Sequence, residues 1–199
     1  MRLFLSLPIE KHFLRVFTRY ADAMSDVRYL RWVPERKLHI TLMFLGELGE
    51  EHSEVLTAAL TRACATHKPF SLELAKVAYA PPGKTSAMVW AYWRIAPELN
   101  TLRVHVGEVC RACGLTPEDQ YVAEADHVPH ITLARFRSDT RVRELRELPR
   151  TELEGHHMLI EGVELLESKQ TKIGSGYRRV ALLTHGGGDT DSVPDQLSP

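Results

Sequence analysis

The tetrapeptide His-Ile-Thr-Leu occurs twice in this sequence, at residues 39–42 and again at residues 130–133. Residues i and i+2 of a β-strand point to the same face of a sheet. If each copy forms a strand, His39 and Thr41 share one face while an isoleucine and a leucine share the other, and the second copy alternates in the same way. Each copy is therefore expected to present an imidazole beside a hydroxyl, backed by buried aliphatic side chains.

Two imidazoles and two hydroxyls suit a displacement at phosphorus. One group must activate the incoming oxygen, and another must protonate the leaving oxygen on the opposite side of the phosphorus. His39 and His130 can do both near neutral pH, because the unperturbed pKa of histidine is about 6.5. The hydroxyls of Thr41 and Thr132 can donate to the non-bridging oxygens, where charge builds up in the transition state. Such a site needs no metal and no nucleotide cofactor, and it predicts a bell-shaped pH profile.

A single His-x-Thr motif on a strand is most often a solvated polar pair, so the argument rests on there being two copies. The sequence between the copies contains strands and helices of its own, as a duplicated lobe would. Two such lobes could bring the motif strands face to face across a cleft. We therefore expect one site built from both copies.

The pattern of apolar residues predicts the elements that must position these motifs. Strands are expected over residues 2–8, 28–34, 37–46, 70–80, 86–95, 128–136, 156–169 and 176–184. Helices are expected over residues 9–24, 50–66, 97–114 and 138–148. Many strands are joined by tight returns and the helices are separate. This order predicts an α+β fold with mostly antiparallel sheets flanking a central cleft and helices on the outside.

The composition is that of an ordinary globular protein. Hydrophobic residues make up 44% and charged residues 26%, and the net charge of −1 gives no overall signal for nucleic acid. Three cysteines cannot all pair within the chain, which suits a reducing cytoplasm. No apolar run approaches the roughly 20 residues that span a bilayer. Residues 185–199 are rich in turn formers, so we expect residues 1–184 to form one bilobal domain followed by a disordered tail.

The flanks of the motifs resemble a known family. The segments "RWVPERKLHITLMFLGEL" (31–48) and "PHITLARF" (129–136) are similar to the bacterial RNA 2′,3′-cyclic phosphodiesterases, also called 2′-5′ RNA ligases, of the 2H phosphoesterase superfamily. The opening "MRLFLSLPIE" and the late "VELLESKQTKIGSGYRRVALL" fit the same family. The resemblance runs over residues 1–184 and implies a bilobal α+β fold with pseudo-twofold symmetry.

The resemblance also implies roles for the motif residues. His39 would be the proton donor to the leaving 3′ oxygen, and His130 would be the proton acceptor that activates water, giving a 2′-phosphomonoester. Thr41 and Thr132 would bind the phosphate, with Arg135 close to it. Strand alternation puts Arg135 on the opposite face from His130, unless the strand bulges near residue 134 or the side chain reaches round from the rim. The family further implies an RNA substrate without metal and ATP-independent 2′-5′ ligation as the reverse reaction. We also expect a monomer.

Two other functions use the same cleft. One is a non-catalytic protein that binds RNA ends or nucleotide phosphates, and the other is a phosphodiesterase for a small cyclic-phosphate metabolite such as an ADP-ribose cyclic phosphate. Among the aromatic residues that could line the cleft, Trp90 and Tyr92 share one face of their strand and Trp93 lies on the other. Cys110 and Cys113 form a Cys-x-x-Cys pair, which we interpret as buried structural cysteines at the end of a helix.

Overall fold

The structure is a computed structural model that describes residues 1–81, 87–116, 128–137, 145–171 and 174–186. Its elements follow the order β1 (Arg2–Leu7), α1 (Lys11–Ala23), β2 (Leu30–Trp32), the short 3₁₀ helix η1 (Glu35–Lys37), β3 (Ile40–Glu47), α2 (Glu50–Ala65), β4 (Phe70–Ala80), β5 (Met88–Trp93), α3 (Pro97–Ala112), β6 (His130–Phe136), β7 (His157–Ile160), β8 (Gly162–Thr171) and β9 (Gly174–Thr184).

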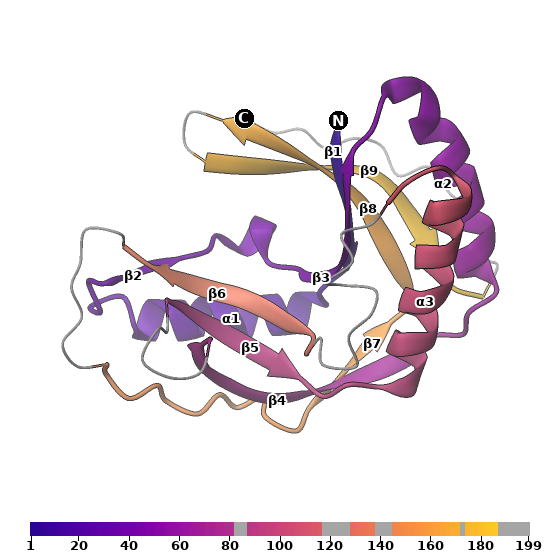
Figure 1. The fold of residues 1–199 in the computed structure, drawn as a ribbon. Helices are drawn as coiled ribbons and strands as arrows, with labels where there is room; N and C mark the ends of the chain where they lie inside the picture. Colours follow the sequence, from indigo (N-terminus) through magenta and orange to yellow (C-terminus); the bar gives the residue numbers. More distant parts are fainter. Residues whose placement is uncertain (82–86, 117–127, 138–144, 172–173, 187–199) are drawn as a thin grey trace.

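The strands form one curled antiparallel sheet in the order β7-β4-β5-β6-β3-β1-β8-β9, with β2 paired to β6 (Figure 1). The order divides into a first half-sheet of β3, β1, β8 and β9 and a second half-sheet of β6, β5, β4 and β7. Within the described residues a single strand pair, Ile40 with Ile131, joins the halves. The predicted α+β fold with mostly antiparallel strands is confirmed, and both motif strands lie at the junction of its two halves.

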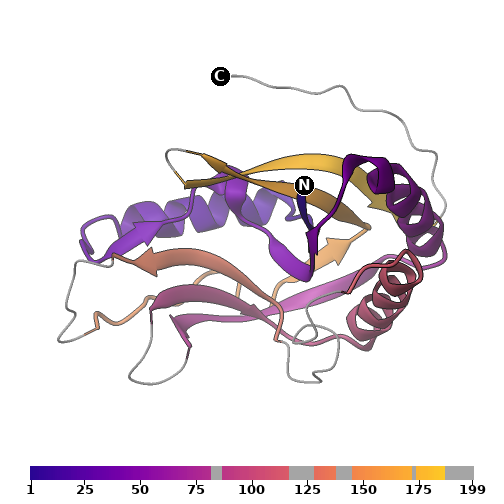
Figure 2. The same cartoon turned by 45° about the horizontal axis from the view of Figure 1, so that its top comes forward.

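The helices cover the outer faces of the half-sheets (Figures 1 and 2). Helix α1 buries the four residues whose spacing predicted it (Phe13, Val16, Phe17 and Tyr20), and it packs on the second half-sheet, where the Phe13 ring lies 5.1 Å from that of Trp93. Helices α2 and α3 pack against each other, and α2 also contacts β8 and β9. Each fully buried aliphatic or aromatic side chain in these layers stabilises the fold by about 1.5–3 kcal/mol.

The predicted strand over residues 156–169 is wrong in one respect, because it is two strands. Strand β7 belongs to the second half-sheet and β8 to the first, so the chain crosses between the halves at Glu161 and Gly162. The two strands pair with different partners, β7 with β4 and β8 with β1 and β9. At the start of β8, a Cβ at Gly162 would lie 2.5 Å from the carbonyl oxygen of Leu183. Only glycine permits this close approach of backbone to backbone.

The helix predicted over residues 138–148 is not confirmed. Residues 138–144 lie outside the described part of the chain, and residues 145–148 are not helical. The backbone N–H of Arg146 donates to the Tyr29 hydroxyl at 2.9 Å, and its carbonyl accepts from the Tyr79 hydroxyl at 2.8 Å. These tertiary hydrogen bonds replace helical ones, and Pro149 disfavours the helical conformation at the residue before it.

The folded region reaches slightly past residue 184. His185 is buried, and its backbone N–H donates to the carbonyl of Glu161 at 2.7 Å. Of the tail expected at residues 185–199, residues 187–199 lie outside the described part of the chain, so the boundary of the domain stays a prediction. No helix among the described residues is long and apolar enough to cross a membrane.

Candidate active site

A β-bulge in β6 sets the geometry of the second motif. Thr132 pairs with Trp90 and residue 134 pairs with Val89, so Leu133 has no partner on β5. Consecutive residues 133 and 134 are both buried, and beyond them Arg135 pairs with Met88. The bulge therefore turns Arg135 to the face that carries His130 and Thr132. Of the two alternatives for Arg135, the structure confirms the bulge.

The first motif carries the same irregularity at the same place. Thr41 pairs with Ser6 and Met43 with Leu5, so Leu42 has no partner on β1. The following residue, Phe44, pairs with Phe4 and so lies on the face that carries the first motif. The position five residues after each histidine is thus turned toward the site, as an arginine in one half and a phenylalanine in the other. This shared bulge supports the internal duplication expected from the repeat.

The register between the motif strands gathers their polar side chains. Ile40 pairs with Ile131 in antiparallel orientation. This pairing brings His39 beside Thr132, and Thr41 beside His130, all on the face opposite the two isoleucines. The structure thus brings the predicted histidines and threonines together at the junction of the half-sheets.

Both imidazoles are held in the same way. The Nδ1 atom of His39 lies 2.8 Å from the carbonyl oxygen of Lys37, and the Nδ1 atom of His130 lies 3.1 Å from that of Val128. A carbonyl oxygen only accepts, so Nδ1 carries the donated proton in each ring. The lone pair of the neutral ring is then on Nε2, which is the nitrogen that exchanges a proton with a bound substrate.

The surroundings of both motif histidines disfavour the protonated ring. Burial lowers the pKa of His39, and the nearby charges of His130 and Arg135 lower it further, against the opposing hydrogen bond to the Lys37 carbonyl. Burial also lowers the pKa of His130, with Arg135 adding to the effect and the Val128 carbonyl opposing it. A bound phosphate anion would counter the positive charges and raise the pKa of both rings.

The two threonine hydroxyls are available to a ligand. Thr41 and Thr132 are half-buried. Within the described part of the chain, neither hydroxyl makes a hydrogen bond. A hydroxyl that is not engaged by a neighbouring protein group and lies beside an imidazole can donate to a phosphate oxygen.

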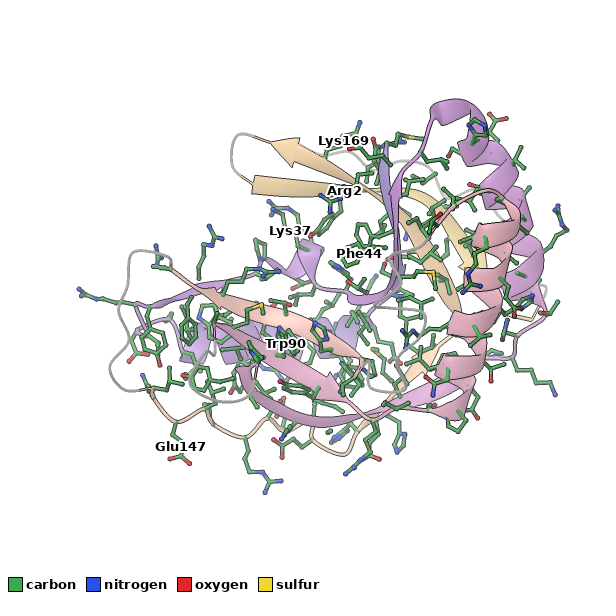
Figure 3. All side chains as sticks on the ribbon, viewed as in Figure 1. Arg2, Lys37, Phe44, Trp90, Glu147 and Lys169 are labelled. Atoms are coloured by element: carbon green, nitrogen blue, oxygen red, sulfur yellow. The ribbon has the colours of Figure 1, made fainter. Side chains whose placement is uncertain are left out.

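Aromatic rings form the walls of the site. The Trp90 ring stacks on the His130 ring, with centroids 3.6 Å apart and an interplanar angle of 17°. The His39 ring contacts Phe4 at 5.2 Å and Tyr177 of β9 at 5.1 Å. Figure 3 labels Trp90 on β5 and Phe44 on β3, on either side of the junction. Trp93 is 1% exposed and belongs to the core, as alternation along β5 predicted.

Sequence reasoning missed most of the aromatic residues that surround His39. These residues are Phe4, Phe44 and Tyr177, which come from three strands and carry no motif of their own. Only the pairing of β1 with β3, and of β9 with the same half-sheet through β8, brings them to the side of His39. The sequence predicts a strand over residues 2–8, but nothing local to that strand marks the face of Phe4 as a site.

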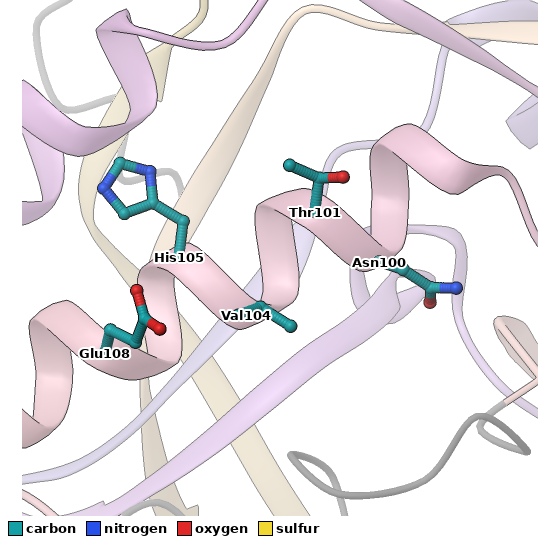
Figure 4. A pocket seen from close by; sticks show the side chains of 5 residues that line it. All are labelled: Asn100, Thr101, Val104, His105 and Glu108. Carbon is teal, nitrogen blue, oxygen red and sulfur yellow. The ribbon is translucent and has the colours of Figure 1, made fainter.

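Other candidate sites do not reach the motifs. A shallow depression lies along α3, lined by Asn100, Thr101, Val104, His105 and Glu108 (Figure 4), and it contains no motif residue. Cys110 is buried and free, as expected, whereas Cys113 is partly exposed. Burial raises the pKa of the Cys64 and Cys110 thiols to about 12. The described residues include no cluster of three or more His, Cys, Asp or Glu side chains that could hold a metal ion.

Comparison with known proteins matches this chain to one superfamily. A sequence model described as the 2′-5′ RNA ligase superfamily matches residues 13–172. A Geobacillus stearothermophilus protein named RNA 2′,3′-cyclic phosphodiesterase is 31% identical over 133 residues, which are 66% of this chain and 41% of that protein. A protein of the same name from Archaeoglobus fulgidus is 27% identical over 137 residues, 69% of this chain and 73% of that one.

Solved structures agree on the fold. A protein from Thermus thermophilus superposes with a TM-score of 0.73 at 24% identity, covering 95% of this chain and 100% of that one. The E. coli protein LigT in complex with 3′-AMP superposes with a TM-score of 0.72 at 22% identity, covering 92% of this chain and 97% of LigT. At these identities the likeness establishes the shared architecture.

Proposed function

The chain belongs to the 2′-5′ RNA ligase superfamily, and we propose that it hydrolyses 2′,3′-cyclic phosphate ends of RNA to 2′-phosphomonoesters without a metal ion. One observation carries the proposal: two imidazoles, each oriented by a carbonyl on Nδ1, meet beside two threonine hydroxyls that have no described protein partner. The relatives named RNA 2′,3′-cyclic phosphodiesterase, from Geobacillus and Archaeoglobus, support the substrate class.

The reaction follows from this placement. His130 takes a proton from water through Nε2 while the water oxygen attacks the phosphorus. Before the reaction, the bound phosphate raises the pKa of His39, so that this ring is protonated at both nitrogens. The bond from phosphorus to the 3′ oxygen breaks, and that oxygen takes the proton from Nε2 of His39, which returns to the neutral form. Thr41 and Thr132 donate to the non-bridging oxygens, and the guanidinium of Arg135 stabilises their charge. The proton count balances, with a 3′-hydroxyl and a 2′-phosphate as products.

The aromatic residues of the site are consistent with a leaving oxygen beside His39 and an attacking water beside His130. The leaving 3′ oxygen belongs to the terminal ribose, so the nucleoside lies on the side of His39. That side carries the apolar rings of Phe4 and Tyr177, which contact each other at 5.2 Å. A ribose and base can pack there, whereas attacking water approaches from the side of His130. The identity of acid and base rests on the family resemblance, because the Nδ1 hydrogen bonds of the two rings are alike.

The same residues account for ligation as the reverse reaction. A hydroxyl can open a 2′,3′-cyclic phosphate in the same way as water. In ligation, the 5′-hydroxyl of a second RNA takes the place of the attacking water and forms the 2′-5′ bond. The cyclic phosphate supplies the activation, so no ATP is required. Incubation of a cyclic-phosphate RNA with a 5′-hydroxyl RNA, followed by gel analysis of 2′-5′ joined product, measures this activity.

Hydrolysis of a cyclic-phosphate oligonucleotide in the presence of EDTA tests the proposal. The His39→Ala and His130→Ala variants are each expected to lose activity by about 10²–10⁴-fold. His156→Ala is the matched control, because His156 is exposed and lies outside the site. Full activity in either motif variant contradicts the proposed chemistry, and loss of wild-type activity in EDTA contradicts metal independence.

Two comparisons separate the alternatives. A binding protein without catalysis would retain an oligonucleotide end without converting it, and its affinity would change little when one histidine becomes glutamine. An enzyme for a small cyclic-phosphate metabolite would turn over a mononucleotide or an ADP-ribose cyclic phosphate faster than an oligonucleotide. We expect the oligonucleotide to be the better substrate.

We further propose that the protein acts as a monomer in the cytoplasm. Buried free thiols at Cys64 and Cys110 are compatible with a reducing compartment. The site is complete within one chain, since both motifs come from the same molecule. Light scattering coupled to size exclusion is expected to give a mass near 22.6 kDa.

A further inference from the structure

Strand pairing identifies a position at which the two halves of the site differ. The residue opposite the motif threonine is Ser6 on β1 in the first half and Trp90 on β5 in the second. The bulge, the Nδ1 hydrogen bond and the threonine are otherwise the same in both halves. The difference is large in volume and in chemistry, because an indole replaces a buried serine that is 0% exposed.

The indole contacts the second histidine directly. Its ring lies 3.6 Å from that of His130 and within 17° of parallel. The described rings around His39 are arranged differently, since Phe4 is tilted by 45° at 5.2 Å and Tyr177 is edge-on at 85°. The plane of the His130 ring is therefore fixed by a stacked partner, whereas the His39 ring is held by tilted and edge contacts.

We propose that Trp90 is a positioning residue that makes the two motif histidines inequivalent, an inference that rests on the proposed function. It fixes the plane of His130 so that Nε2 meets the attacking water, and its negative face stabilises the positive charge that the ring acquires on taking the proton. The lobe with Ser6 lacks this stabilisation. The acceptor role of His130 thus has a structural basis in the residue across the strand.

Other charges near His130 bear on its titration. The titratable and charged neighbours of His130 are Arg135 on β6, Tyr92 on β5 and His39 before β3. Two more cations lie beyond these neighbours. Arg31 on β2 pairs with Arg135, and Lys76 on β4 lies 5.8 Å from the Tyr92 ring centre. Among these cations, Arg135 disfavours a charged His130. The stacked indole of Trp90 favours the charged ring, as the Val128 carbonyl does. Removal of the indole is therefore expected to lower the pKa of His130.

The test begins with the free protein and needs no substrate. Titration of the histidine ring resonances by NMR is expected to give a lower pKa for His130 in Trp90→Leu than in the wild type, with Trp90→Phe intermediate. His67, which contacts His105 at 2.9 Å and lies outside the site, is the internal reference. Trp32→Phe is the matched control for the loss of an indole, since Trp32 packs on Tyr20 at 6.0 Å.

Activity provides the second measurement. With a cyclic-phosphate oligonucleotide, kcat is expected to fall about 3- to 10-fold in Trp90→Leu, with a smaller change in KM and a shift of the acidic limb of the pH profile to lower pH. Trp90→Phe is expected to recover most of the rate. An unchanged His130 titration in both folded variants overturns the inference. If the wild-type protein turns over no cyclic phosphate, the proposed function fails, while the NMR titration still decides whether Trp90 acts on His130.

Discussion

Replacement of Thr132 by valine separates a transition-state contact from a structural one. Valine has the shape of threonine without the hydroxyl and is equally suited to a strand. The Thr132 hydroxyl makes no hydrogen bond to a described residue, so the substitution breaks none there. The free energy of unfolding is therefore expected to change by less than about 1 kcal/mol.

The catalytic effect is expected to be much larger. A donor aimed at the developing charge contributes about 2.7–4 kcal/mol to the transition state. Thr132 is half-buried, so solvent weakens the contact and the lower end of this range applies. A loss of about 2.7 kcal/mol corresponds to a fall of roughly 100-fold in kcat/KM, since each 1.36 kcal/mol is about tenfold. Thr41→Val is expected to behave alike.

The assay is initial-rate hydrolysis of a cyclic-phosphate oligonucleotide, with thermal unfolding measured in parallel. Thr101→Val is the matched control, because the Thr101 hydroxyl bonds to the Pro97 carbonyl at 3.0 Å within α3 and lines the depression of Figure 4. Its kcat/KM is expected to stay at the wild-type value. If Thr132→Val and Thr41→Val both keep activity within about threefold while remaining folded, the hydroxyls do not bind the phosphate and the reasoning is refuted.

Three further outcomes are expected. Arg135→Met should raise KM about 10-fold or more by removing a charged phosphate contact, measurable by steady-state kinetics, and an unchanged KM would remove Arg135 from the site. Gly162→Ala should destabilise the fold by about 1–3 kcal/mol in urea unfolding, because its Cβ would lie 2.5 Å from the Leu183 carbonyl, and wild-type stability would contradict the close approach. Burial lowers the pKa of His67, with His105 adding, and burial lowers that of His185, with His67 adding. Below pH of about 6.5 the unfolded chain binds more protons than the folded one, so Tm should fall with pH there, less steeply in His185→Gln.

The sequence by itself determined the class of the fold and the residue types of the candidate site. The repeat of His and Thr two residues apart fixes an imidazole and a hydroxyl on one face of a strand, because side chains alternate with a period of two. The apolar residues at helical spacing, Phe13 and Val16 among them, also specify α1, since these periodicities depend on local backbone geometry alone. Local rules suffice for properties of a single element.

Only the tertiary structure decided how the elements meet. The bulge at Leu133 that turns Arg135 into the site depends on the register of β6 against β5, and no residue type in "HITLAR" specifies it. The split between β7 and β8 follows from their pairing with different strands, β7 with β4 and β8 with β1 and β9. Likewise Trp90 meets His130, and Tyr177 meets His39, through pairings between distant strands. The sequence names the candidate reacting groups, but their neighbours are set by long-range packing, which local patterns do not encode.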